Sequence, residues 1–228
     1  MLVRDFMTPN PVTISPNTSH HEAVKIMRER RFRRLPVVDE HGHLVGIVVE
    51  KDLLSAQPSP ATTLSIWEIH NLLSKLKVAD IMSHPVYTVR AYCPIEDAAR
   101  IMVQHRIGCL PVMEGDKLIG IITETDIFRT LTQMLAGGEP GIRIAVRMPR
   151  MQGAVLRLAQ AIYENHGRIV SMATLNEPDG QHKLVAVKVT DANPADLEKA
   201  LHAHSDWEIE DFRESSDCHV PQLFGKPK

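Results

Sequence analysis

Gly120-Ile121-Ile122-Thr123-Glu124-Thr125-Asp126 decides the fold, because the same pattern occurs earlier in the chain as Gly46-Ile47-Val48-Val49-Glu50-Lys51-Asp52. Two further pairs of stretches match: Val3-Arg4-Asp5-Phe6-Met7 with Val78-Ala79-Asp80-Ile81-Met82, and Leu35-Pro36-Val37-Val38 with Leu110-Pro111-Val112-Met113. The spacing between the copies is constant as far as Val38 and becomes slightly shorter after it, because the turn that follows is shorter in the second copy. Matching motifs at a nearly constant spacing indicate a duplicated structural unit.

Each copy has the pattern of a strand, a helix, two strands and a second helix. The helices are expected to begin after Asn17-Thr18-Ser19 and at Pro94, which are helix start signals. Residues 44–49 and 118–122 are short apolar runs around one glycine, as expected of strands covered on both faces. Because each copy is too small for a generous core, we expect the two copies to pack against each other.

The junction after Ile122 predicts an anion site. A strand that turns at once into a helix leaves unpaired backbone N–H groups at the helix start, beside the Thr123 hydroxyl. One turn later, the Asp126 carboxylate can accept hydrogen bonds from both hydroxyls of a ribose. The same two residues also fit a helix cap that needs no ligand. In the first copy Asp52 is kept, but Val49 replaces the hydroxyl, so the second site is expected to bind a nucleotide better.

The recurrence of Met7 and Met82, the Leu-Pro-Val strands and the Gly-apolar-apolar-X-X-X-Asp endings together resemble a pair of CBS domains, or Bateman module, from Met1 to about Leu135. The resemblance implies an adenine nucleotide site in each copy. In the second copy it implies these contacts: ribose on Asp126, phosphate near Thr123, and adenine between Tyr87, Thr88, Cys109 and Pro111. Their equivalents in the first copy are Asp52, Val49, Val12, Thr13, Arg34 and Pro36.

A basic run, Arg28-Glu29-Arg30-Arg31-Phe32-Arg33-Arg34, lies in the first copy. Arginines pair with phosphate in a bidentate manner, so the run is a candidate for phosphate contacts. A solvated helix face explains it equally well. Its counterpart contains His105 and Arg106, a pair that the CBS resemblance implies faces a phosphate from the partner repeat.

After the glycine-rich stretch at residues 137–141 the pattern changes. Strands are expected at residues 142–147, 168–175, 183–189 and 207–212, with helices at 153–165 and 194–204. This is the ferredoxin-like order. With Pro149 and Gly153 at the first turn, it resembles an ACT domain, a regulatory module that often binds amino acids. Two CBS units before an ACT-like unit resemble the accessory proteins of acetoin utilisation.

We therefore expect an α+β protein divided as follows: CBS repeat 1 at residues 1–57, a linker helix at 58–77, CBS repeat 2 at 78–136, a linker at 137–141, an ACT-like domain at 142–214 and a tail at 215–228. In the linker helix, Ile66, Ile69, Leu72, Leu73 and Leu76 fall on one face.

Composition limits the function. The chain of 228 residues is 43% hydrophobic, which suits globular domains, and its formal charge of −2 disfavours generic nucleic-acid binding. It lacks an apolar stretch of roughly 20 residues and a secretory start, so a cytoplasmic location without membrane contact is expected. Cys93, Cys109 and Cys218 have no metal-like spacing, and reduced thiols are expected. His20-His21 and His41-Gly42-His43 are expected to be exposed, and no metal site is predicted.

The sequence contains no nucleophile elbow, P-loop or dinucleotide fingerprint, so an enzyme is not expected. The predicted function is a regulator that senses an adenine nucleotide in the cleft between the CBS domains: AMP, ADP, ATP, S-adenosylmethionine or a dinucleotide. The bound state would pass through conformation or dimer geometry to an unidentified regulated protein, and a homodimer is expected. The alternatives are a structural dimerisation adaptor with vestigial pockets, and an amino-acid sensor that uses the ACT-like domain.

Overall fold

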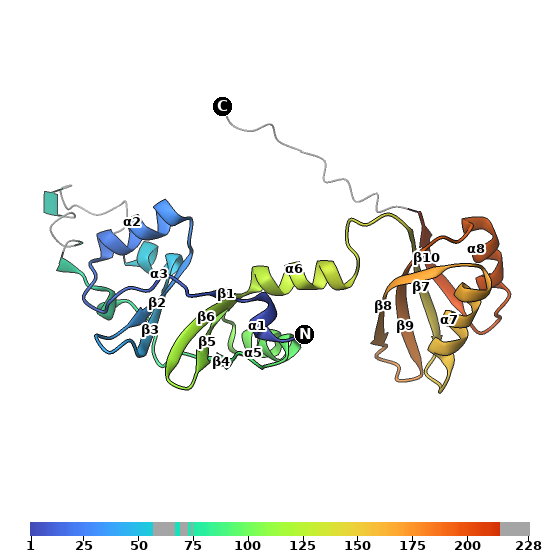
Figure 1. The fold of residues 1–228 in the computed structure, drawn as a ribbon, viewed down its shortest axis with the longest axis horizontal. Helices are drawn as coiled ribbons and strands as arrows, with labels where there is room; N and C mark the ends of the chain where they lie inside the picture. Colours follow the sequence, from blue (N-terminus) through green and yellow to red (C-terminus); the bar gives the residue numbers. More distant parts are fainter. Residues whose placement is uncertain (57–66, 69–72, 74, 215–228) are drawn as a thin grey trace, which may run out of the picture. The chain divides into compact units, whose positions relative to one another are not determined.

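The computed structural model describes residues 1–56, 67–68, 73 and 75–214. Two compact units divide the chain, residues 1–128 and 129–228. The division falls within a helix, upstream of the stretch at residues 137–141 that the sequence marked as a linker. The elements of the first unit, shown in Figure 1, are α1 Val3–Phe6, β1 Thr8–Pro9, α2 His20–Arg30, β2 Arg34–Val38, β3 Leu44–Val49, α3 Glu50–Ser55, η1 Val78–Asp80, β4 Val89–Arg90, α5 Ile95–His105, β5 Cys109–Glu114, β6 Lys117–Thr123 and α6 Glu124–Met134.

The start signals in the two copies are confirmed. Helix α2 follows Ser19, whose side chain accepts the N–H of Glu22, and α5 follows Pro94. Both helices also end in the same way, at Arg31 and Arg106, which adopt left-handed conformations with φ of 56° and 54°. The duplication therefore extends to the backbone conformation of each helix end.

The two repeats exchange their leading segments. Strand β1 pairs with β6 of the second copy, Thr8 opposite Ile121, and completes a sheet of order β1-β6-β5-β4. Conversely, Ser83 forms a bridge with Ile47 in β3 of the first copy. The cores follow the same exchange: Val3 packs in the core of the second copy, and Val78 in that of the first. Each repeat is thus completed by residues that precede the other.

The recurrence of methionine with glycine has a steric cause. A Cβ atom placed on Gly120 would lie 2.4 Å from Sδ of Met7, and one placed on Gly46 would lie 2.3 Å from Sδ of Met82. Atoms of real side chains do not approach so closely, so each glycine makes room for the methionine of the exchanged segment. The two motifs recur together because they contact each other.

His20 contradicts the expectation of exposure. It is only 3% exposed, and its Nε2 lies 2.8 Å from the carbonyl oxygen of Leu53 in α3. A buried imidazole with a hydrogen-bond partner avoids the cost of an unsatisfied polar group. His20 therefore ties α2 to α3, whereas His41 and His43 are exposed as expected. The predicted apolar face of the linker helix and Cys218 fall largely outside the described residues.

The second unit contains β7 Ile142–Pro149, α7 Ala154–Glu164, β8 Arg168–Asn176, β9 His182–Thr190, α8 Pro194–His202 and β10 Glu208–Arg213. This is the predicted succession of strands and helices. The antiparallel sheet has the order β10-β7-β9-β8, and both helices share one core with it, including Val146, Leu158, Val187 and Leu197 (Figure 1). Across the described ranges of both units, no helix has the length and apolar character needed to cross a bilayer.

Candidate functional site

A cavity of about 490 Å³ lies where the two repeats meet. Three segments line it: the chain around β1, the end of α2 with the start of β2, and the junction of β6 with α6. Val12, Arg34 and Pro36 come from the first copy, and Thr123 comes from the second. The exchange of leading segments explains this, because the pairing of β1 with β6 holds the leading segment of the first copy against the strand that ends at Thr123.

The Asp126 carboxylate is oriented by Thr123. Its Oδ2 accepts the backbone N–H of Thr123 at 2.9 Å and the Thr123 hydroxyl at 2.7 Å, and the residue is 8% exposed. This is the helix cap that the sequence allowed. The same backbone bond occurs at three other helix starts, namely Leu2 to Asp5, Val49 to Asp52 and Lys77 to Asp80, at 2.9, 3.4 and 3.0 Å. Capping alone therefore explains why an acid recurs at this position.

The cavity groups the predicted site residues differently from the sequence. The sequence placed Thr123 with Tyr87 and Cys109 of its own copy, but the cavity joins Thr123 to Val12 and Arg34 of the other copy. The physical reason is the strand exchange. Because β1 of the first copy pairs with β6 of the second, side chains that are far apart in the sequence line the same cavity.

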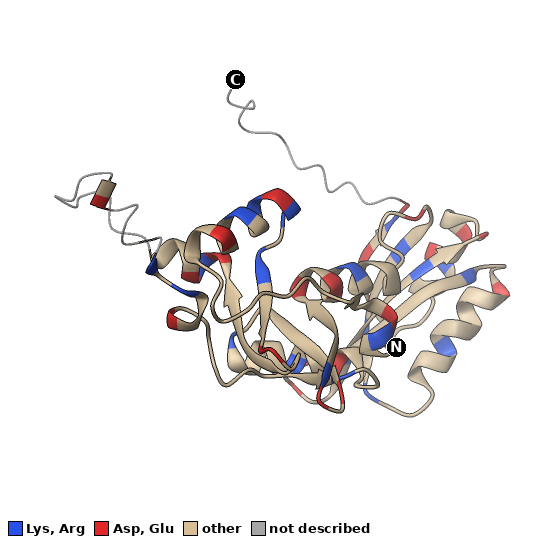
Figure 2. Ribbon diagram, turned by 60° about the vertical axis from the view of Figure 1, so that its left-hand side comes forward, with Lys and Arg blue, Asp and Glu red and all other residues tan. Residues whose placement is uncertain are grey.

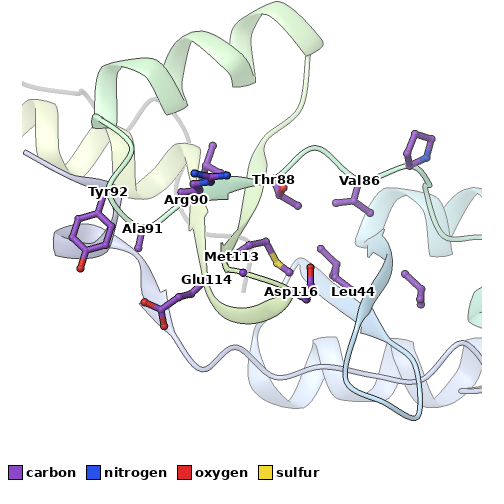
Figure 3. Close-up of a pocket in the computed structure, with 13 residues that line it drawn as sticks. Leu44, Val86, Thr88, Arg90, Ala91, Tyr92, Met113, Glu114 and Asp116 are labelled. Carbon is purple, nitrogen blue, oxygen red and sulfur yellow. The ribbon is translucent and has the colours of Figure 1, made fainter.

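Two of the remaining predicted residues line other cavities. Thr13 lines a separate cavity of about 540 Å³ together with His41 and Asp116. Thr88 lines one of about 950 Å³, in which Figure 3 also labels Arg90 and Asp116. Tyr87 and Thr88 precede β4, which begins at Val89. These residues are not brought together with Thr123.

His105 and Arg106 stand at the end of α5. The ring of His105 stacks on that of Tyr87, with 3.9 Å between the ring centroids. When the two copies are aligned, Tyr87 and Arg106 correspond to Val12 and Arg31 of the cavity beside Thr123. The stacked pair thus belongs to the pseudo-equivalent position, where Asp52 supplies the acid and Val49 supplies no hydroxyl.

Cys109 and Pro111 lie behind the cavity in β5. Cys109 pairs with Thr123 in the register of β5 and β6, and Pro111 pairs with Ile121. Burial raises the pKa of the Cys109 thiol to about 11. The thiol is therefore protonated at neutral pH and acts as a small apolar group beside Thr123.

Glu124 and Gly108, which the sequence did not single out as site residues, both lie beside the Arg34 side chain. Nη2 of Arg34 lies 3.6 Å from Oε2 of Glu124, which forms an ion pair between the copies. A Cβ atom on Gly108 would lie 2.3 Å from that same nitrogen, so the guanidinium passes directly over this glycine. In the alignment of the two copies, Gly108 stands where the first copy has Arg33. Only the structure shows that this glycine makes room for the Arg34 guanidinium.

A second polar cluster lies in the other unit. Glu177, Asp179 and His182 place potential metal ligands within 4.8 Å of one another. Arg147 already binds this group, with Nε 2.7 Å from Glu177 and Nη2 3.0 Å from Asp179. The hydrogen bond from His182 holds the pKa of the Asp179 carboxyl well below its usual range. These contacts form an ion-pair network around a guanidinium, which explains the cluster without a metal.

The first unit defines the class of protein: a mixed α+β tandem repeat in which two similar halves complete each other around a shared cavity. The model of the CBS domain matches residues 3–59 and 78–133. A CBS domain-containing protein of Dictyostelium discoideum is 32% identical over 136 residues, which cover 59% of this chain and 94% of that protein. The chain therefore belongs to the CBS-domain family and carries a tandem CBS pair.

Two other relatives are informative. The chloroplastic CBS domain-containing protein CBSX2 of Arabidopsis thaliana is 36% identical over 152 residues, covering 58% of this chain and 64% of that protein. Its crystal structure in complex with AMP is 35% identical, with a TM-score of 0.48 and coverage of 58% and 96%. The acetoin utilization protein AcuB of Vibrio cholerae has a TM-score of 0.50 and 32% identity, covering 61% of this chain and 98% of that chain. The chain thus spans less than two thirds of CBSX2, and the match to the CBS-domain model ends at residue 133.

Proposed function

We propose that this protein is a non-catalytic regulator that binds an adenine nucleotide in the cavity beside Thr123. The observation that carries the proposal is the convergence of three kinds of group on one cavity. Helix α6 begins there and favours an anion. Arginines from the end of α2 and the start of β2 add positive charge, and Val12 and Pro36 offer apolar surface to a base.

Asp126 is the proposed ribose ligand. It lies one turn into α6, and the preceding residues Glu124 and Thr125 line the cavity. The two hydrogen bonds from Thr123 fix the direction of its carboxylate, which a rigid contact to a sugar diol requires. Capping and ribose binding are compatible, because a carboxylate has about four acceptor positions.

The pseudo-equivalent site around Asp52 is proposed to be the weaker one. Val49 offers no hydroxyl, and its backbone N–H lies 3.4 Å from the Asp52 carboxylate, against 2.9 Å at Asp126. A hydrogen bond contributes about 0.5–1.5 kcal/mol, so the loss of the hydroxyl bond that orients the carboxylate weakens binding up to roughly tenfold.

Binding becomes a signal when the nucleotide prefers one arrangement of the repeats. The cavity contains groups from both copies, including the ion pair of Arg34 with Glu124. A ligand shifts the equilibrium between two arrangements of the copies only if it binds one arrangement more tightly than the other. We infer that the ion pair is the first contact to respond.

The experiment is a thermal-unfolding titration of the full chain with adenosine, AMP, ADP, ATP and S-adenosylmethionine. AMP is the first compound to test, because it is the smallest of these that carries an adenine, a ribose diol and a phosphate together. A ligand at 100 times its Kd adds about 2.7 kcal/mol. Recovery of unchanged nucleotide after long incubation separates a sensor from an enzyme, and no shift with any compound overturns the proposal.

The second unit supports a homodimer. Strand β8 lies at the edge of its sheet and exposes Val170 at 37% and Leu175 at 65%. The opposite edge, β10, is protected by acidic residues. A long apolar edge strand is a template for pairing with a second copy. We expect a dimer by light scattering, and the double variant Val170→Lys/Leu175→Lys should shift it toward monomer, while Leu156→Lys on α7 should not.

The proposal for this unit also includes its ACT-like character. Gly153 precedes α7 in a left-handed conformation, with φ of 81°, at the turn where the resemblance expects a glycine. An amino-acid sensor requires a ligand site at this turn, so a screen of the common amino acids in the same thermal assay tests that alternative. A shift with an amino acid, but not with a nucleotide, favours it.

A further inference from the structure

The cavity beside Thr123 is lined by three arginines. Arg31, Arg33 and Arg34 all belong to the basic run, and Glu124 is the one carboxylate among the lining residues that the structure describes. Figure 2 shows this basic stretch continuing from the end of α2 into β2. Arg28 and Arg30 are exposed and do not line the cavity, which fits a solvated helix face, whereas Arg31 and Arg33 are exposed at the cavity itself and Arg34 is partly buried there.

The internal duplication provides a comparison within the same chain. When the two copies are aligned, Arg31, Arg33 and Arg34 correspond to Arg106, Gly108 and Cys109. One arginine is thus common to both copies, whereas the other two occur only in the first. The shared arginine has the same left-handed backbone in both, so the extra charge was added to a common framework.

The position of Arg34 depends on the second copy. Its guanidinium passes over Gly108, where a Cβ atom would come within 2.3 Å, and reaches Glu124 at 3.6 Å. The side chain is 23% exposed, compared with 56% for Glu124. An exposed carboxylate at this distance holds the arginine weakly, so an incoming phosphate can replace it.

Resting on the proposed function, we propose that this cavity selects adenine nucleotides with two or more phosphates over AMP, and that Arg33 and Arg34 read the additional phosphate. A monophosphate satisfies the helix start and the shared Arg31. The remaining two cations then stay unpaired with ligand, whereas a diphosphate or triphosphate reaches them. Arginine recognises phosphate by two parallel N–H donors, which gives this contact both strength and geometry.

The test is calorimetric titration of the full chain with adenosine, AMP, ADP and ATP in the presence of EDTA, which keeps the nucleotides free of Mg²⁺. We expect ADP and ATP to bind at least about tenfold more tightly than AMP, the factor given by 1.4 kcal/mol. Arg33→Ala should reduce this ratio to about threefold or less, because ADP and ATP lose more affinity than AMP. Arg30→Ala is the matched control, because Arg30 belongs to the same run but does not line the cavity, and it should preserve the ratio.

The outcomes separate the two proposals. Equal affinity for AMP and ATP in the parent, or an unchanged ratio in Arg33→Ala, overturns the phosphate preference and leaves the nucleotide site standing. Failure of all four compounds to bind overturns the nucleotide site, and the preference with it. Raising the salt concentration should narrow the ratio in the parent, because screening weakens the added charge contacts.

Discussion

Replacing Asp126 by alanine, in parallel with Asp80→Ala, separates a ribose ligand from a helix cap. Both acids accept the backbone N–H of the residue three positions earlier, at 2.9 Å from Thr123 and 3.0 Å from Lys77. Asp126 is on the helix that opens at the cavity, whereas Asp80 is in η1. The pair therefore shares the capping bond and differs in its surroundings.

The expected magnitudes follow from the bonds. Asp126→Ala removes the two hydrogen bonds from Thr123, worth about 1–3 kcal/mol, and Asp80→Ala removes the one from Lys77, worth about 0.5–1.5 kcal/mol. At about 2–4 °C per kcal/mol, both losses are visible as a lower Tm of the unliganded protein. Removing charged hydrogen bonds to two ribose hydroxyls costs about 3 kcal/mol of binding energy in addition, at about 1.5 kcal/mol each.

The assay is the nucleotide-induced change in Tm. At 100 times the parental Kd, the ligand adds about 2.7 kcal/mol to the parent, which corresponds to roughly 5–10 °C. A loss of about 3 kcal/mol weakens binding more than a hundredfold, so Asp126→Ala should retain only about 1 °C of that shift. Asp80→Ala should retain nearly all of it. If Asp126→Ala and Asp80→Ala respond equally to nucleotide, Asp126 is a cap and nothing more.

Three further outcomes are expected. Gly108→Ala should leave Tm nearly unchanged, because the added methyl meets only the flexible ends of the Arg34 and Glu124 side chains, yet it should lower the ATP-to-AMP affinity ratio by calorimetry; an intact ratio would contradict the placement of Arg34. Gly120→Ala should cost about 1–3 kcal/mol in denaturant unfolding, because Met7 must repack in the core, and a neutral effect would count against the tight contact. The Cys109 thiol has a pKa of about 11 in the folded chain against about 9 when unfolded, so it contributes stability below pH 9 that is lost as the pH rises to 11. The Tm of Cys109→Ala should therefore fall less than the Tm of the parent between about pH 9 and pH 11, and equal decreases in Tm would exclude this contribution of the thiol to stability.

Much of the fold was predictable because its signals are local. Ser19 and Pro94 mark helix starts by chemistry that acts within one turn, and both helices begin directly after them. The duplication itself is visible without a structure. The burial of His20 was not predictable, because it depends on the carbonyl of Leu53, which is 33 residues away in the sequence.

The larger difference between the sequence prediction and the structure concerns which site residues line the same cavity. The sequence gives no local signal for the pairing of Thr8 with Ile121, since a two-residue strand has too few residues to show a period. Without knowledge of that pairing, Val12 and Thr123 are assigned to two different sites, one in each copy. Motif and resemblance proposed the individual residues, while the common cavity of Val12, Arg34 and Thr123 is visible only with the strand exchange.

The strand exchange also brings residues that differ between the two copies together at one cavity. When the copies are compared separately, only the first has Arg33 and Arg34 and only the second has Thr123, so the two differences favour different copies. In the structure all three residues line the same cavity, and the alignment of the copies assigns Gly108, Cys109 and Val49 to the equivalent positions. Changes in both halves of the chain have thus concentrated donors and positive charge on one side of the pair. This concentration of donors and positive charge predicts one strong anion site per pair of repeats, at the cavity beside Thr123, and a weaker one at the pseudo-equivalent position.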